Sequence, residues 1–175
     1  HVNTKIIENG KVIDELINPL GFRWFSFDAN TGFSLNGKKM VLKGTNRHQD
    51  FKDRGDALSN EDHYRDLKLI KDMGCYFLRL AHYPQAPEVL ALADKMGLLV
   101  WEEIPLVNYM NPVPEFLANT EYMIKEMIRQ NYNHPSVIIW GSMNEILLWG
   151  KNAERVQDHV NEKEYERLKS HAESE

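Results

Sequence analysis

The pattern of hydrophobic and polar positions changes about a quarter of the way along this chain. Before that point, apolar residues alternate with polar ones over short stretches, as at 21–27, which is typical of β-strands with one buried face. Asn9-Gly10 lies between two such stretches and is a strong signal for a hairpin turn, and a second turn is predicted at 35–38. The pattern therefore predicts β-structure for residues 1–36.

From Met40 onward, short apolar runs alternate with longer segments whose apolar residues recur at helical spacing. An N-cap signal at Ser59 and a proline at Pro87 mark helix starts, and Gly74 and Gly97 mark helix ends. Strands are predicted at 40–44, 76–80, 98–101 and 137–141, with helices between them. Regular alternation of strand and helix predicts a parallel sheet with right-handed crossovers.

The four strand–helix units leave two architectures open. They form either a small open α/β domain or half of an eightfold barrel, which needs about 250 residues when complete. The helix that begins near Glu115 must end before His134-Pro135, because proline lacks an amide hydrogen and pushes the residue before it out of the helical region. A charged segment at 152–169 follows the last strand and is predicted to be helical.

Composition narrows the class of protein without choosing a function. With 42% hydrophobic and 27% charged residues in 175, the chain has the balance of a soluble globular domain. No basic cluster accompanies the net charge of -5, so neither a nucleic-acid nor a membrane-surface partner is indicated. The single cysteine, Cys75, excludes an intrachain disulfide and a multi-cysteine zinc site, and it is expected to be a small buried residue.

The ends of the chain carry no targeting signal that the sequence reveals. No run approaches the roughly eighteen apolar residues of a membrane span, and the first residues do not resemble a signal peptide. The chain is expected to begin within a larger protein, so the cellular compartment stays open.

Candidate chemistry lies at the end of the last predicted strand. Asn144-Glu145 places an amide beside a carboxyl group at the carboxyl end of the strand at 137–141. In an α/β barrel this end of the strands carries the active site. The simpler alternative is a solvated pair that opens a loop.

Two motifs resemble a known family. Residues 133–145, NHPSVIIWGSMNE, closely resemble the acid/base signature of family 2 glycoside hydrolases, and residues 79–84, RLAHYP, resemble that family's other signature. The resemblance covers about residues 15–150 and implies the first half of a (β/α)8 TIM barrel at 37–175. It also implies that residues 1–36 are the end of an immunoglobulin-like β-sandwich domain with a linking strand.

The resemblance implies roles for individual residues. Glu145 resembles the acid/base of a retaining glycosidase, whose pKa partial burial against Trp140 or another carboxylate could raise. Asn144 resembles the residue that binds the sugar 2-hydroxyl, and Arg79 one that steadies the nucleophile. His82 resembles a sugar-contacting histidine, with a loop histidine as the alternative. The family's nucleophile is expected beyond residue 175.

The neighbouring acids Glu102 and Glu103 are not assigned as nucleophile. Glu103 aligns with a family acid that orients polar groups, and an ion pair between Arg79 and Glu103 is the structural alternative for both residues. Glu102 is expected to face the helices or solvent. Where some β-galactosidases have a Glu-x-His pair that binds magnesium, this chain has 104–108, IPLVN, so no metal or other cofactor is expected.

Three further positions have weaker assignments. Asn46-Arg47-His48 matches a family triplet near the pocket rim, with solvated surface as the alternative. His134 is expected to fix the helix–strand turn through a hydrogen bond. Trp149 could stack on a sugar ring or lie in the core.

The resemblance favours an exo-acting, retaining hydrolase of terminal β-glycosidic bonds, most similar to β-galactosidases, with a carbohydrate as its partner. β-Glucuronidase or β-mannosidase specificity is an alternative, as is a non-catalytic carbohydrate-binding or assembly module. Because half a barrel leaves strand edges and an inward face open, with Val137 and Ile139 expected on that face, the 175-residue chain by itself is expected to self-associate.

Overall fold

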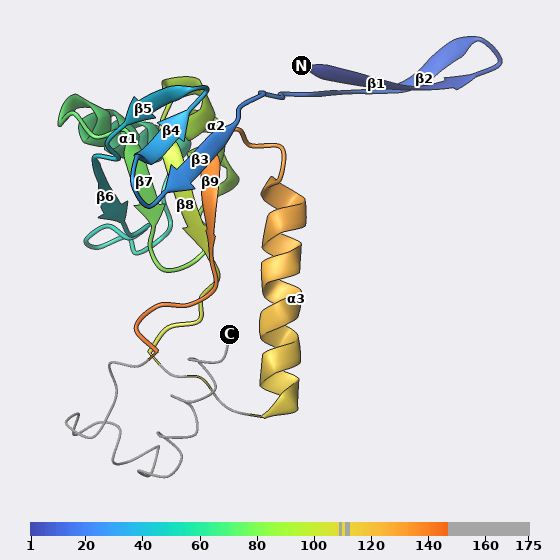
Figure 1. Cartoon of the computed structure of the whole chain (residues 1–175). Helices are drawn as coiled ribbons and strands as arrows, with labels where there is room; N and C mark the ends of the chain where they lie inside the picture. Colours follow the sequence, from blue (N-terminus) through green and yellow to red (C-terminus); the bar gives the residue numbers. More distant parts are fainter. Residues whose placement is uncertain (109, 111–112, 147–175) are drawn as a thin grey trace, which may run out of the picture.

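A four-stranded parallel sheet forms the centre of the molecule (Figure 1). The structure is a computed structural model that describes residues 1–108, 110 and 113–146. The strands lie side by side in chain order: β6 (Gly44–Arg47), β7 (Phe77–Leu80), β8 (Leu99–Glu103) and β9 (Val137–Gly141). Between them run α1 (Asn60–Asp72), α2 (Pro87–Met96) and α3 (Pro114–Asn131). This is the parallel sheet with intervening helices that the alternation predicts, with two strands placed within a residue or two of expectation.

The first barrel strand lies later in the chain than predicted. Residues 40–44 were expected to form it, but Met40 ends β5 (Lys38–Met40) and pairs with Phe33 in a separate antiparallel sheet. The parallel strand starts only at Gly44, where a Cβ atom would lie 2.3 Å from the carbonyl oxygen of Phe77. The apolar residues before Gly44 pack outside the parallel sheet, since Leu42 contacts the cluster that includes Phe33.

That antiparallel sheet closes the amino ends of the barrel strands. It consists of β3 (Phe25–Asp28), β4 (Gly32–Leu35) and β5, in the order β3-β4-β5. Phe33 of β4 is buried against Leu99 at the start of β8 and Ile138 near the start of β9. We call this end of the sheet the base, and the opposite end, where the strands finish, the mouth.

The helices begin and end with the signals read from the sequence. The Ser59 side chain and Asp62 form a reciprocal capping box at the start of α1, and Gly97 ends α2 in the left-handed conformation with φ 68°. The main core lies between the sheet and α1 and α2, and fully buried residues such as Leu78, Val89 and Val100 form it.

A register shift between Val100 and Trp101 sets which face each β9 residue occupies. After the shift Trp101 pairs with Ile139 and Glu103 with Gly141, on the inner side of the barrel wall. Val137, which pairs with Val100, packs in the core on the helix side. The expectation that Val137 faces inward was therefore wrong, because the bulge adds one residue to the alternation.

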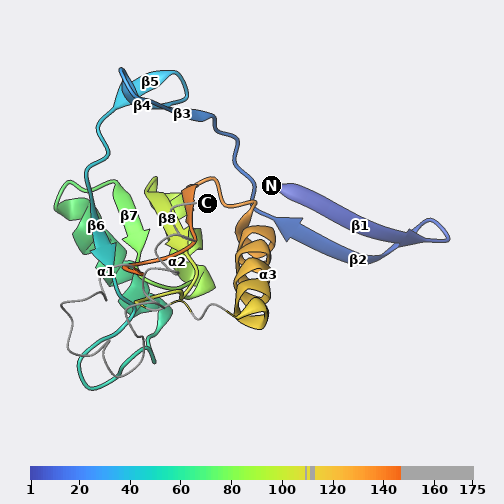
Figure 2. The same cartoon turned by 60° about the horizontal axis from the view of Figure 1, so that its bottom comes forward.

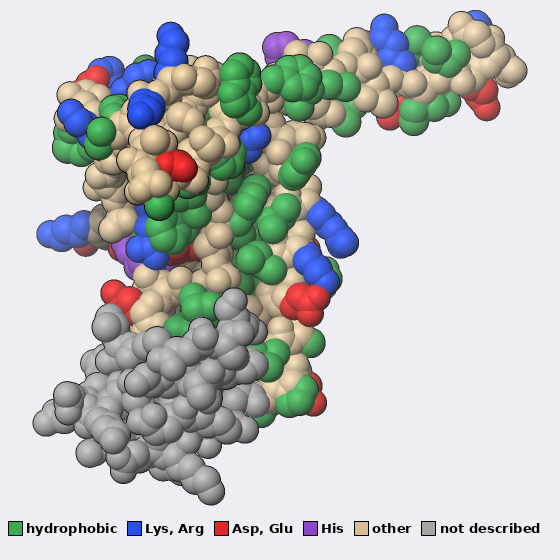
Figure 3. Space-filling model, viewed as in Figure 1, with side chains coloured by type: hydrophobic (Ala, Val, Ile, Leu, Met, Phe, Trp, Pro, Cys, Tyr) green, Lys and Arg blue, Asp and Glu red, His purple; other side chains and the backbone are tan. Residues whose placement is uncertain are grey.

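The N-terminal hairpin extends away from the rest of the molecule (Figures 1 and 2). It joins β1 (Val2–Glu8) to β2 (Lys11–Asn18), and both turn residues have positive φ, as expected for Asn-Gly. Apolar side chains are exposed along this arm (Figure 3), among them Ile6, Ile7, Val12, Ile13, Leu16 and Ile17. The predicted origin in a sandwich domain stays a prediction, and the boundary proposed after residue 36 falls within the β4–β5 turn.

Three smaller expectations concern single residues or segments. Cys75 lies at the junction of α1 and β7 and is partly rather than fully buried. No helix in the described part of the chain is long and apolar enough to cross a membrane. Trp149 and the helix predicted at 152–169 lie outside the described residues.

Candidate active site

Four of the predicted site residues meet at the mouth. Arg79 lies on β7, His82 in the loop that follows it, Glu103 at the end of β8, and Asn144 in the loop after β9. Arg79 donates through Nε and Nη2 to the two carboxylate oxygens of Glu103, each over 3.0 Å, and Nη2 also donates to Oδ1 of Asn144 over 2.8 Å. The parallel sheet thus places side chains from three different strands in one hydrogen-bonded cluster.

Glu103 is the centre of this cluster. It is 0% exposed, and its oxygens receive the Arg79 fork and a 2.6 Å contact from Nδ1 of His82. Because an ionised carboxylate only accepts hydrogen bonds, Nδ1 of His82 carries the proton in this contact. The ion pair proposed as the structural alternative for Arg79 and Glu103 is therefore present, and His82 joins it.

Packing holds the guanidinium of Arg79 from the side. Its carbon atom lies 4.7 Å from the centre of the Trp101 ring, a cation–π distance. The side chains of Trp101 and Glu103 have room because β9 has a glycine, Gly141, opposite them. A Cβ atom on Gly141 would lie 2.3 Å from Nε1 of Trp101 and 2.6 Å from Cβ of Glu103.

Asn144 is fixed by its backbone as well as its side chain. Its N–H donates to the carbonyl of Leu106 over 2.8 Å, and its carbonyl accepts from Asn108 N–H over 3.0 Å. The side chain is buried, and among the described residues its Nδ2 atom has no hydrogen-bond partner. A buried amide donor with a free hydrogen can bind an acceptor placed at the mouth.

Glu145 follows directly and is exposed, with φ 55° in the left-handed region. The sequence suggested that Trp140 or another carboxylate could partly bury it, and Trp140 does not. Trp140 pairs with Glu102 on the helix side of the sheet and packs against the core there. Strand alternation therefore points Trp140 away from the mouth.

Glu102 faces the helices, as expected. It is 1% exposed and accepts two hydrogen bonds from Nδ2 of Asn131 on α3, over 3.0 and 3.1 Å. Burial raises the pKa of its carboxyl to about 7, although the Asn131 hydrogen bonds and the nearby His134 act in the opposite direction. Glu102 is thus excluded from the cluster around Glu103.

The triplet Asn46-Arg47-His48 divides between two environments. His48 lies at the mouth, where its ring meets that of His82 edge-on at 5.1 Å. Arg47 is buried and points towards α1, where Nε donates to Asp66 over 2.9 Å. The solvated-surface alternative is therefore wrong for Arg47.

His134 fixes the turn between α3 and β9, as predicted. Its Nδ1 lies 2.6 Å from an oxygen of Asp94 on α2, and the other oxygen of Asp94 accepts from Ser136 N–H over 3.0 Å. Two residues around the mouth were missed by the sequence reading, Gln49 and Gln85, and Tyr83 was included only as part of the motif at 79–84. No composition or spacing signal marks Gln49 and Gln85, because their roles come from partners distant in the sequence.

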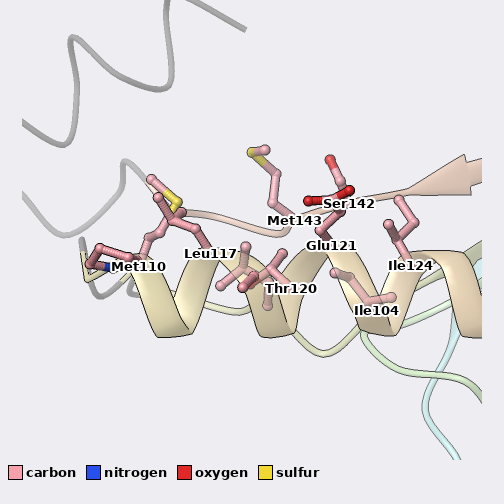
Figure 4. A pocket seen from close by; sticks show the side chains of 11 residues that line it. Ile104, Met110, Leu117, Thr120, Glu121, Ile124, Ser142 and Met143 are labelled. Carbon is pink, nitrogen blue, oxygen red and sulfur yellow. The ribbon is translucent and has the colours of Figure 1, made fainter.

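An apolar pocket of about 640 Å³ lies beside the site, between α3 and the segments that follow β8 and β9 (Figure 4). Ile104, Leu117, Ile124 and Met143 line it, and it contains none of the predicted site residues. Within the described ranges, no group of three or more His, Cys, Asp or Glu side chains could hold a metal ion. The expected independence from magnesium stays a prediction.

Comparison with known proteins identifies the family. The family model "Glycosyl hydrolases family 2, TIM barrel domain" matches residues 29–174. The chain belongs to glycoside hydrolase family 2. Both family 2 signatures read from the sequence fall inside the matched range, and they contain all the cluster residues except Glu103.

Relatives in family 2 have two different names. A β-glucuronidase of Bacteroides fragilis is 41% identical over 158 residues, which are 86% of this chain and 23% of the relative. A β-galactosidase of Bacteroides ovatus is 35% identical over 155 residues, 82% of this chain and 18% of the relative. The crystal structure of a Bacteroides uniformis β-glucuronidase has a TM-score of 0.78 and 46% identity, over 89% of this chain and 18% of that one. The chain thus spans about a fifth of the length of these relatives.

Proposed function

We propose that this chain forms part of a retaining hydrolase of terminal β-glycosidic bonds in which Glu145 is the acid/base. The observation that carries the proposal is the position of Glu145. Its exposed carboxyl group immediately follows Asn144, whose side chain is fixed by Arg79 at the edge of a buried polar cluster. An accessible carboxyl beside a rigid, polar sugar-binding surface is the arrangement that protonation of a glycosidic oxygen needs.

The cluster residues would act on the sugar and on the second carboxylate. The unpaired Nδ2 hydrogen of Asn144 would bind the 2-hydroxyl group, a contact that strengthens in an oxocarbenium-like transition state. Arg79 would steady the nucleophile, and His82, whose Nδ1 is engaged by Glu103, would present its other ring nitrogen to a sugar hydroxyl.

Glu103 does not fit the role of nucleophile. Its carboxylate is fully buried and accepts from both Arg79 and His82, so neither oxygen is available to attack an anomeric carbon. Retention requires a second carboxyl about 5 to 5.5 Å from the acid/base. We place that residue in a part of the longer protein outside this chain.

The sugar is a separate part of the proposal. The sequence motifs favoured a β-galactoside, whereas β-glucuronidases are prominent among the relatives with higher identity, at 41% against 35% for the two named above. We propose that the substrate is a β-galactoside or a β-glucuronide. Rates for the complete protein on the two aryl glycosides, measured in parallel with the β-mannoside, would decide between them.

The acid/base role is tested by Glu145→Gln in the complete protein. Hydrolysis of a disaccharide, whose leaving group needs a proton, should slow by about 10² to 10⁴. With an activated aryl glycoside, the rate of the glycosylation step should fall by less. Azide should restore the rate of deglycosylation, because azide is a nucleophile that needs no general base. Wild-type turnover of the disaccharide by this variant would refute the assignment.

For the 175-residue chain alone we propose a different behaviour. The described residues contain a four-stranded parallel sheet in which β6 and β9 each have one neighbour, and the carboxylate of Glu103 at the mouth is engaged by Arg79 and His82. We propose that the isolated chain self-associates and has no glycosidase turnover.

A further inference from the structure

The loop at 81–86 carries His82, and the carboxyl end of β6 holds this loop at both ends. Ala81 N–H and the Nε2 group of Gln85 both donate to the carbonyl of Arg47, over 3.0 and 2.7 Å. Farther along, Ala86 N–H donates to Oε1 of Gln49 over 2.7 Å, and Gln49 N–H donates to the hydroxyl of Tyr83 over 3.0 Å. The loop therefore depends on β6 for its position.

Arg47 and Gln85 form the closed part of this contact, which we call the Arg47–Gln85 clamp. The Nη1 group of Arg47 donates to Oε1 of Gln85, while Nε2 of Gln85 donates back to the Arg47 carbonyl. Both side chains are buried, at 5% and 9% exposure. The side-chain amide of glutamine is needed here because it combines a donor and an acceptor, which glutamate and leucine do not.

The other two nitrogen atoms of Arg47 also have partners. Nε donates to Asp66, and Nη2 lies 3.0 Å from Nδ1 of His63. Because a guanidinium only donates, Nδ1 of His63 accepts this bond and the ring is neutral. Burial of His63, together with the charge of Arg47, lowers the pKa of the imidazole. These bonds fix the orientation of the Arg47 side chain, and its bond to Gln85 in turn fixes the side chain of Gln85.

The clamp connects to the candidate active site through one residue. His82 directly follows Ala81, whose N–H is bonded to the Arg47 carbonyl. The Nδ1 atom of His82 lies 2.6 Å from Oε1 of Glu103. Glu103 in turn holds Arg79, which holds Asn144. We propose that Gln85 is a positioning residue that sets the place of His82 relative to Glu103 and the sugar, an inference that rests on the proposed function. Gln85 itself is buried and hydrogen-bonded to Arg47, so it would act through His82 and not on the sugar directly.

The test uses the complete protein and the variants Gln85→Leu and Gln85→Glu. Leucine removes both hydrogen bonds. Glutamate keeps the acceptor for Arg47, and so favours folding, but it removes the donor to the Arg47 carbonyl. Since a misplacement of about 1 Å can cost about 100-fold, kcat/KM should fall by roughly 10- to 100-fold in both variants. Gln130→Leu, on the exposed face of α3, is the matched control and should retain wild-type values.

A double-mutant cycle with His82→Ala separates positioning from general damage. If Gln85 acts through His82, Gln85→Leu should change kcat/KM by less than about threefold once His82 is absent. A full additional loss in the His82→Ala background would overturn the proposal, as would wild-type kinetics of the single variants.

A structural readout covers the case in which the proposed function fails. If the complete protein hydrolyses no glycoside, a crystal structure of Gln85→Leu still measures the distance between His82 Nδ1 and Glu103 Oε1. Separation of these atoms beyond hydrogen-bond reach supports the clamp. An unchanged distance refutes it, whatever reaction the protein catalyses.

Discussion

Two adjacent acids on β8 show how strongly one residue's orientation decides its chemistry. Glu103 points to the mouth and is neutralised by Arg79, whereas Glu102 points to α3 and, among the described residues, has only the amide of Asn131 as a hydrogen-bond partner. The pKa of Glu102 is accordingly raised to about 7, mainly by burial. The folded state therefore holds a proton on Glu102 more tightly than the unfolded chain does.

This difference predicts a pH-dependent effect of Glu102→Gln. Stability from protonation of Glu102 is complete below the unfolded pKa of 4.5 and is lost as the pH rises through about 7. Glutamine is neutral at every pH and can keep the bond from Asn131. Above pH 7 the variant should be more stable than wild type by roughly 3–4 kcal/mol, because the pKa rises from 4.5 to about 7 on folding and one pKa unit corresponds to about 1.4 kcal/mol.

Thermal unfolding midpoints of the complete protein at several pH values would measure this effect. The midpoints of variant and wild type should converge below pH 4.5, where Glu102 is protonated in both the folded and the unfolded state. Glu126→Gln, on the exposed face of α3, should show no such divergence. A destabilised variant at pH 8 would mean that ionised Glu102 has a stabilising partner that we have not identified.

At this scale the sequence predicted contacts that follow from strand alternation and from the family motifs. The Arg79–Glu103 ion pair, given as the structural alternative, is present, and Glu102 faces the helices. Trp140 points the other way and does not bury Glu145, and the bond from Arg79 to Asn144 was not predicted. Gln85 could not be predicted, since both of its partners belong to Arg47, which lies 38 positions away in the sequence.

At the scale of elements, the packing of β8 on β9 depends on Gly141. A methyl group there would meet the side chains of Trp101 and Glu103 at distances that real Cβ atoms do not show. Gly141→Ala should therefore displace Glu103 and lower both stability and kcat/KM, the latter by about 100-fold if the cluster shifts by about 1 Å.

Kinetics and thermal unfolding of the complete protein would check this prediction. Ser142→Ala changes the next residue without adding an atom and serves as the control. Normal activity in Gly141→Ala would show that β9 can move away from β8 without disturbing the cluster.

Element boundaries were predictable where local chemistry sets them. Asn9-Gly10 and Asn36-Gly37 form turns with positive φ, and Ser59 and Gly97 cap helices as read. The start of β6 was not predictable, because the apolar residues before it pack at the base instead of joining the parallel sheet. Position 44 at the start of β6 must be glycine because the Phe77 carbonyl leaves no room for a side chain, and this is a long-range contact.

At the scale of the whole molecule, the 175-residue chain exposes surfaces that another copy could cover. The edges of β6 and β9 and the apolar arm at 2–18 lie open in the described part of the chain, and Ile139 on the inner side is only partly buried. Unpaired strand edges favour association with a second chain. We expect light scattering to show dimers or larger species across micromolar concentrations, and activity assays to show no turnover.

A stable, monomeric and active 175-residue protein would contradict both expectations. As a control for the arm, a chain that lacks residues 1–20 should still associate if the barrel edges are responsible. Loss of association in this shortened chain would assign the contact to the hairpin instead.

The antiparallel sheet at the base has a consequence for engineering. Leu99, which packs on Phe33, and Glu103, which holds Arg79, lie at opposite ends of β8, about 13 Å apart at the usual rise of a strand. Free-energy effects of substitutions farther apart than about 7–10 Å usually add. Cavity-filling changes among Phe25, Phe33 and Leu35 should therefore raise heat tolerance independently of changes at the mouth that alter sugar preference, so that libraries for the two properties can be screened apart and then recombined.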